Sequence, residues 1–95
     1  MHAYAIFIRE RIRDPQEIAT YSAKAGASLE GHACKVLAAY GKSETLEGPE
    51  ADGVVIVEFP SLAEAKAWYE GEAYRDARKH RFLGADYRAI FVEGT

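Results

Sequence analysis

The chain has 95 residues, of which 48% are apolar, and this size and content fit one compact domain spanning residues 1–95. Its net charge of −3 is spread along the chain and offers little attraction for a polyanion such as nucleic acid. The single cysteine, Cys34, excludes an internal disulfide, and no apolar run approaches the ~20 residues needed to cross a bilayer. We therefore expect a cytoplasmic protein with neither a nucleic-acid nor a membrane partner.

The first predicted elements are a strand and a helix. Residues Ala3 to Arg9 are β-branched and aromatic enough for a strand. Asp14 is then placed to cap a helix in which Pro15 takes the first position, and Gly31 supplies the stop signal. Between them, a narrow apolar face recurs at helical spacing, formed by Ile18, Tyr21, Ser22, Ala25 and Leu29.

The middle of the chain predicts two more strands joined by a polar connection. Residues Cys34 to Tyr40 read as the second strand, and residues Val54 to Phe59 as the third. The connection from Lys42 to Gly53 contains turn signals, and Thr45 to Glu47 is a candidate for a brief extra strand within it.

The last third predicts two helical segments and a final strand. Ser61 and Glu64 have the spacing of a capping box, which starts a helix over Leu62 to Tyr69. A second short helix covers Glu72 to Leu83, and Tyr87 to Val92 form the last strand.

The resulting order is β-α-β-β-α-β, which predicts an α+β fold. Two right-handed crossover units joined by a hairpin give a four-stranded antiparallel sheet with both helical segments on one face. This is the ferredoxin-like fold.

The first and third strands are apolar on both faces, because Tyr4 to Ile8 and Val54 to Val57 do not alternate with polar residues. Both helical segments are needed on one face of the sheet. The simplest way to cover the other face is therefore the same face of a second copy of the chain. We therefore predict a homodimer with two sheets packed face to face, burying on the order of 800 Å² per subunit.

Several residues together resemble the family known as domain of unknown function 1330. They are the stretch Val55 to Ser61, the pair Trp68-Tyr69, and Tyr74, Ala77 and Arg78, with Glu47-Gly48 upstream and Val92 to Gly94 at the end. The resemblance covers nearly the whole chain. It implies the dimeric α/β-barrel superfamily, in which small-molecule sites lie between sheet and helices. That superfamily includes cofactor-free monooxygenases, muconolactone-isomerase-like enzymes, haem proteins and stress-responsive proteins.

Two charged residues are candidates for a site. His32 follows the first helix, where it fits either a general acid or base or a loop histidine that caps the helix. Arg78 lies four residues after Tyr74 and therefore on a buried face. It fits either a clamp for a carboxylated ligand or a structural ion pair, with Glu58 or with a glutamate across the dimer.

Aromatic residues are candidates for the walls of a substrate pocket. Trp68, Tyr69 and Tyr74 follow one another along the second helical region, and Tyr21 lies on the first helix opposite them. All four fit core residues as well. The basic run Arg75, Lys79, His80 and Arg81 is interpreted as a solvated helix end.

Two functions remain open from the sequence. One is a dimeric small-molecule-binding protein or cofactor-free enzyme acting on a small apolar or aromatic acid, with His32 as the acid or base and Arg78 as the anion clamp. The other is a non-catalytic homodimer whose aromatic residues build core and interface. The first requires His32 and Arg78 to converge on one cavity. No metal site and no cofactor are predicted.

Overall fold

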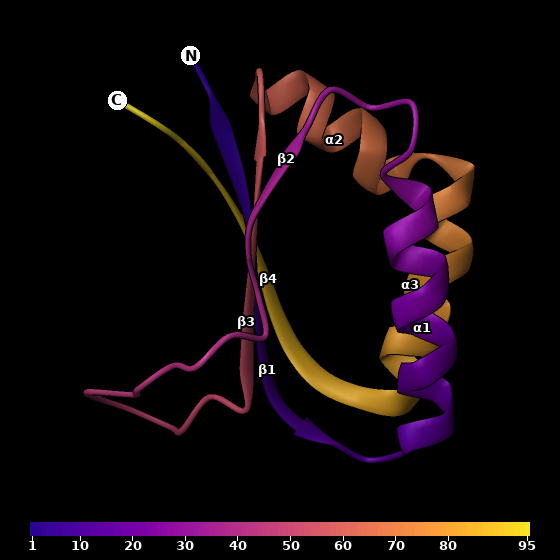
Figure 1. Ribbon diagram of the computed structural model, residues 1–95, viewed down its shortest axis with the longest axis vertical. Helices are drawn as coiled ribbons and strands as arrows, with labels where there is room; N and C mark the ends of the chain where they lie inside the picture. Colours follow the sequence, from indigo (N-terminus) through magenta and orange to yellow (C-terminus); the bar gives the residue numbers. More distant parts are fainter.

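The computed structural model describes residues 1–95, which form four strands and three helices (Figure 1). The elements are β1 (Ala3–Ile12), α1 (Pro15–Ser28), β2 (Lys35–Ala39), β3 (Gly53–Phe59), α2 (Leu62–Glu70), α3 (Glu72–Gly84) and β4 (Ala85–Glu93). None of the helices has the length and apolar character needed to span a bilayer.

The strands form one antiparallel sheet in the order β2-β3-β1-β4, and all three helices lie on one side of it (Figure 1). This is the ferredoxin-like arrangement, so the fold prediction is confirmed. The strand order follows from the two crossovers, which each place a helix on the same face. Some bounds differ from expectation: β1 continues to Ile12, β2 ends at Ala39, and β4 begins at Ala85. Residues Thr45 to Glu47 form no strand.

The predicted helix starts are present. The side chain of Asp14 accepts a hydrogen bond from the backbone N–H of Gln16, and Pro15 takes the first position of α1. Ser61 Oγ accepts from the backbone N–H of Glu64 at 3.2 Å and caps α2. These bonds satisfy backbone donors that have no partner inside the helix, so both starts are set locally by the sequence.

The core lies between the helices and one face of the sheet. Its centre is aromatic: the rings of Trp68 and Tyr74 lie 4.1 Å apart, centroid to centroid, and the ring of Phe59 lies 5.4 Å from that of Trp68. Tyr74 and Phe59 are the largest fully buried side chains. Burial of each such ring contributes roughly 1.5–3 kcal/mol.

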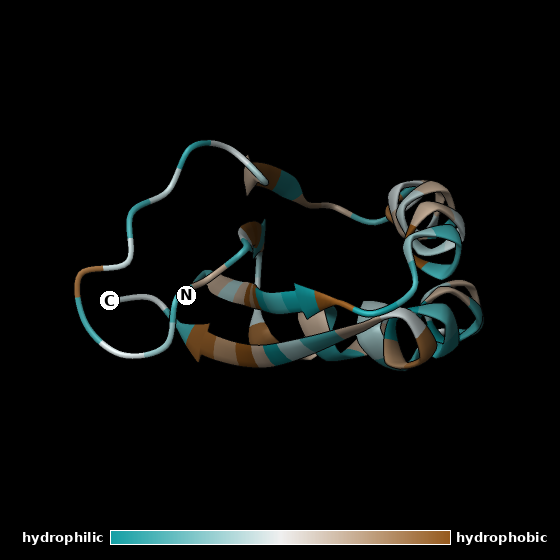
Figure 2. Ribbon diagram, turned by 90° about the horizontal axis from the view of Figure 1, so that it is seen from below, coloured by the Kyte–Doolittle hydropathy of each residue, from teal (hydrophilic) through white to brown (hydrophobic).

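No helix covers the other face of the sheet, and Figure 2 colours several residues of the strands as hydrophobic. Ile6 is in register with Ile56 on one side and with Ile90 on the other, so the three form one row across the sheet. The apolar residues of this open face are Tyr4, Ile6, Ile8, Val54, Ile56, Ile90 and Val92. The expectation that the sheet is apolar on both faces is therefore confirmed.

A long loop, residues 40–52, joins β2 to β3 and extends away from the sheet on the side opposite the helices (Figures 1 and 2). Leu46 in this loop is 88% exposed. The loop and the open face therefore lie on the same side of the molecule.

Candidate functional site

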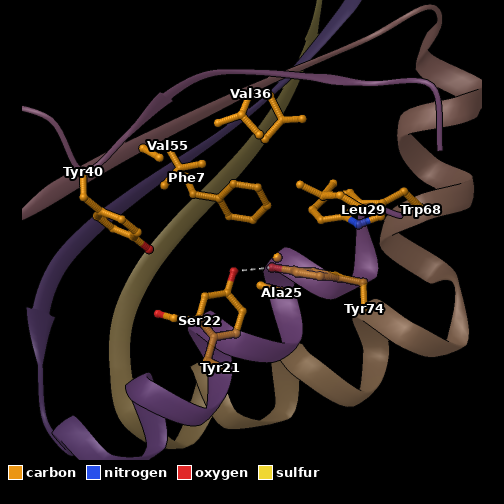
Figure 3. Close-up of a pocket in the computed structure, with 13 residues that line it drawn as sticks. Phe7, Tyr21, Ser22, Ala25, Leu29, Val36, Tyr40, Val55, Trp68 and Tyr74 are labelled. Atoms are coloured by element: carbon orange, nitrogen blue, oxygen red, sulfur yellow. Dashed lines mark hydrogen bonds between the residues drawn. The ribbon is translucent and has the colours of Figure 1, made fainter. Parts of the chain in front are cut away.

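A cavity of about 180 Å³ lies between α1 and the helix-covered face of the sheet (Figure 3). It is lined by Phe7, Tyr21, Ser22, Ala25, Gly26, Leu29, Val36, Ala39, Tyr40, Val55, Val57, Trp68 and Tyr74. The exposed members of this lining come from α1 and from β2 and the residue after it, so the mouth opens between those elements. An apolar cavity of roughly 150 Å³ holds benzene in another protein, so this one has room for a small aromatic ring.

The lining contains no charged side chain, and its buried polar groups are already paired. The hydroxyl oxygens of Tyr21 and Tyr74 lie 2.7 Å apart and share a hydrogen bond. Trp68 Nε1 donates to Ser28 Oγ at 3.0 Å, and that hydroxyl donates to the carbonyl oxygen of Ala25. Trp68 therefore presents only its apolar surface to the cavity.

The tyrosines of the cavity stay protonated. Burial raises the pKa of Tyr21, Tyr74 and Tyr40, and hydrogen bonds to neighbouring phenols raise the pKa of Tyr21 and Tyr40 further. A neutral phenol donates one hydrogen bond and accepts two, but it is no base near neutral pH. The lining can therefore orient a hydroxyl or carbonyl oxygen, and it contains no general base.

The structure brings three of the predicted site residues together. Tyr21, Trp68 and Tyr74 all line the cavity, from α1, α2 and α3 respectively (Figure 3). Their role as walls of a ligand site stays a prediction, now with a shared cavity to support it.

His32 lies elsewhere. It is exposed and borders a separate hollow beside Phe59 and Glu64, with no part in the lining of the main cavity. Its backbone N–H donates to the carbonyl oxygen of Leu29, which places it in the turn after α1. Its role as a catalytic acid or base stays a prediction.

Arg78 and Tyr69 also lie outside the main cavity. The guanidinium carbon of Arg78 lies 4.3 Å from the Tyr69 ring centroid, and its Nη1 lies 3.4 Å from Glu70 Oε1. The carboxylate beside Arg78 therefore belongs to Glu70, whereas Glu58 lies on the open face of the sheet, in register with Tyr4. His32 and Arg78 do not converge on one cavity.

Arg81 was misinterpreted from the sequence. Instead of lying at a solvated helix end, it is 3% exposed, and its Nε has no hydrogen-bond partner. Its guanidinium carbon lies 5.5 Å from the Phe7 ring centroid and 5.3 Å from that of Tyr87, and Nη2 lies 3.4 Å from Tyr69 Oη. The molecule thus buries one arginine among aromatic rings, next to the cavity wall formed by Phe7.

A sequence signal for this burial existed. Arg81 follows Tyr74 and Ala77 at the i, i+3 and i+7 positions of one helix face, and both of those residues are buried. The interpretation as a solvated helix end rested on the charge of the basic run rather than on this spacing. Tyr40, which borders the cavity mouth, was missed as a site residue because the sequence showed it only as the last residue of the second predicted strand, beside Gly41.

Solved structures share this fold. A protein of unknown function from Rhodopseudomonas palustris is 25% identical with a TM-score of 0.78, over 99% of this chain and 82% of that chain. A dimeric ferredoxin-like protein of unknown function from Thermobifida fusca is 14% identical with a TM-score of 0.66, over 97% and 90%. A cofactor-independent oxygenase from Streptomyces nogalater is 7% identical with a TM-score of 0.63, over 99% and 92%.

The last two likenesses concern the fold alone, because their identities are low. No protein of curated function matches the chain. The family described as domain of unknown function 1330 matches residues 2–95, and the chain belongs to this family.

Proposed function

We propose that the protein is a homodimer that binds a small, flat, largely apolar molecule in the cavity between α1 and the sheet. The observation that carries this proposal is the lining: an aromatic and aliphatic wall with no charged side chain, broken only by neutral hydroxyl groups. Such pockets are typical of ligand sites in which apolar contact supplies affinity and a few polar groups fix orientation.

The ligand class is an aromatic molecule with a hydroxyl or carbonyl oxygen. The sequence favoured a small apolar or aromatic acid held by Arg78, but Arg78 is stacked on Tyr69 and paired with Glu70. A carboxylate in this cavity would have no cation in the lining, and an unpaired buried charge is strongly unfavourable. A weak acid such as a phenol, which enters the cavity uncharged, avoids this penalty.

Binding is better supported than acid–base catalysis. The hydroxyl groups of the lining stay protonated, and His32 borders a different hollow. A cofactor-free oxygenase reaction has support only from a shared fold with the oxygenase from Streptomyces nogalater. A purely structural role for the homodimer would not account for the cavity beside α1.

The second copy is proposed to cover the open face of the sheet. On a single chain, Ile90 and Val92 are each 46% exposed on this face, next to the half-buried row of Ile6 and Ile56. A contiguous apolar face of this kind marks an interaction site in a soluble protein. The ferredoxin-like protein from Thermobifida fusca is described as dimeric, which supports the same assembly here.

Filling the cavity tests the binding site. Ala25 lines the cavity from α1, whereas Ala23 lies exposed on the same helix, so Ala25→Phe and Ala23→Phe form a matched pair. Titration calorimetry with toluene is expected to give one site per chain in the wild type and in Ala23→Phe. Affinity is expected to fall at least about tenfold in Ala25→Phe, because its ring occupies the space of the ligand.

The proposal fails if the wild type binds no toluene, or if Ala25→Phe binds it as tightly as Ala23→Phe does. Circular dichroism and thermal unfolding of both variants establish that each is folded at the temperature of the titration.

A further inference from the structure

Tyr40 has an unusual backbone conformation. Its φ is 58°, and it is the only residue other than glycine with a positive φ. This region is disfavoured for a bulky side chain and persists only where the surrounding structure enforces it. The backbone N–H of Tyr40 donates to the carbonyl oxygen of Val54 at 2.9 Å, which anchors this conformation at the end of β2.

The ring of Tyr40 is held by two neighbours. It packs on Gly53, where an added Cβ would come within 2.5 Å of the ring. The guanidinium carbon of Arg9 lies 4.5 Å from the ring centroid, and Arg9 Nε donates to Asp52 Oδ2 at 2.9 Å. Two features thus set the position of this ring: the space left by the absent side chain of Gly53, and the Arg9 guanidinium, which is held by an ion pair.

The hydroxyl of Tyr40 is fixed as well and remains accessible. It lies 2.6 Å from the hydroxyl of Tyr87, while Tyr40 itself is 39% exposed at the mouth of the cavity. Figure 3 shows the Tyr40 hydroxyl pointing into the cavity, toward the hydroxyl of Tyr21. Two phenols that share one hydrogen bond still offer one free O–H donor and several acceptor lone pairs.

The strained backbone, the fixed ring and the free hydrogen-bonding capacity occur at one residue, and that residue lines the proposed binding site. We propose that Tyr40 determines specificity there: its hydroxyl binds the hydroxyl of a phenolic ligand whose ring lies in the apolar part of the cavity. This inference rests on the proposed function and names its ligand class. Tyr40 prepares the site in advance, so that binding need not order its side chain.

A matched pair of probes isolates this interaction. Toluene and 4-methylphenol differ by one hydroxyl group, and both have the size of a single substituted ring. In the wild type, calorimetry is expected to show tighter binding of 4-methylphenol, by about threefold to tenfold, the size of one net hydrogen bond. In Tyr40→Phe this preference is expected to disappear, while the affinity for toluene stays within about twofold of the wild type.

Tyr87→Phe is the control. It removes the same bond between the two phenols, but Tyr87 does not line the cavity and the Tyr40 hydroxyl remains. This variant is expected to keep the preference for 4-methylphenol, and both variants keep their rings and should unfold at similar temperatures.

The outcomes separate the two proposals. If the wild type binds toluene but has no preference for 4-methylphenol, or if Tyr40→Phe keeps that preference, the role of Tyr40 is wrong and the binding cavity stands. The role of Tyr40 is also wrong if Tyr87→Phe loses the preference for 4-methylphenol together with Tyr40→Phe. If neither probe binds the wild type, both the proposed function and the role of Tyr40 are wrong.

Discussion

At the scale of single residues, Arg81 is the least expected feature of the molecule. A buried guanidinium normally has a carboxylate partner, yet the side chain of Arg81 hydrogen-bonds to the hydroxyl of Tyr69, at 3.4 Å. Its charge interacts with the aromatic faces around it and partly opposes the rise in pKa that burial causes at Tyr21 and Tyr74. Desolvation of an ion costs several kcal/mol, whereas each cation–π contact stabilises the folded state by about 0.5–2 kcal/mol.

We expect Arg81→Met to raise the free energy of unfolding by about 1–2 kcal/mol, because methionine fills a similar volume without a charge to desolvate. Arg81→Ala should lower it by about 2–4 kcal/mol, since it leaves a cavity in the core. Urea unfolding of the three proteins measures both effects. A loss of more than about 1 kcal/mol in Arg81→Met would show that the aromatic contacts outweigh the desolvation.

At the scale of elements, the attachment of α1 is important because this helix forms one wall of the cavity. Asp76 on α3 bridges to α1: its carboxylate lies 2.6 Å from Lys24 Nζ, and it also pairs with Lys79 at 2.8 Å. Hydrogen bonds from Lys24 and then Lys79 lower the pKa of Asp76 to about 2. The ionised form is therefore favoured by folding, although the pair is exposed and its effect is small.

We expect Asp76→Asn to be slightly less stable than the wild type at pH 6. The contribution of Asp76 is complete above the unfolded pKa of about 3.9 and is lost as the pH falls toward the folded pKa of about 2. Thermal unfolding between pH 6 and pH 2 should therefore show the two curves converging. Glu47→Gln, in the exposed loop, is the control. If the difference in unfolding temperature between the wild type and Asp76→Asn stays constant with pH, the ion pair does not contribute to stability.

At the scale of the whole molecule, the helices cover only one face of the sheet, and the apolar residues of the other face form the surface of the proposed dimer. The row formed by Ile6, Ile56 and Ile90 crosses the middle of this open face. In a symmetric dimer each such residue occurs twice in the interface, so a single substitution acts on both subunits. The extended loop around Leu46 lies on the same side of the molecule as this open face.

Ile90→Glu is expected to give a folded monomer. Ile90 is 46% exposed in a single chain, so the fold should tolerate a glutamate there, whereas two buried carboxylates should weaken dimerisation by roughly 100-fold or more. Light scattering after size-exclusion chromatography measures the mass. Leu83→Glu, at a 60% exposed position on α3, should remain dimeric, and a dimeric Ile90→Glu would argue against assembly through this face.

The fold could be predicted from the sequence because its signals are local. Asp14 with Pro15 and Ser61 with Glu64 set the helix starts, and the two-sided apolar character of β1 and β3 predicted a sheet with both faces in need of cover. These patterns depend on residues a few positions apart, so they are visible without any knowledge of packing.

The lining of the cavity could be predicted only in part. Tyr21, Trp68 and Tyr74 were recognised because large aromatic residues on helix faces have to be buried somewhere. Sequence spacing does not say which aromatic ring borders a cavity. For this reason Tyr69 was grouped with them, although it lies outside the cavity lining and its ring stacks on Arg78.

The sequence by itself determined the order of strands and helices, the helix starts and the apolar character of both sheet faces, since each depends on short-range periodicity and capping. Only the tertiary structure decided that Arg81 is buried, that His32 and Arg78 lie apart, and that Tyr40 is fixed at a cavity mouth. The physical reason is that these positions follow from contacts between distant segments. Arg9, Tyr40 and Tyr87 come together only when β1, the end of β2 and β4 take their places around one sheet.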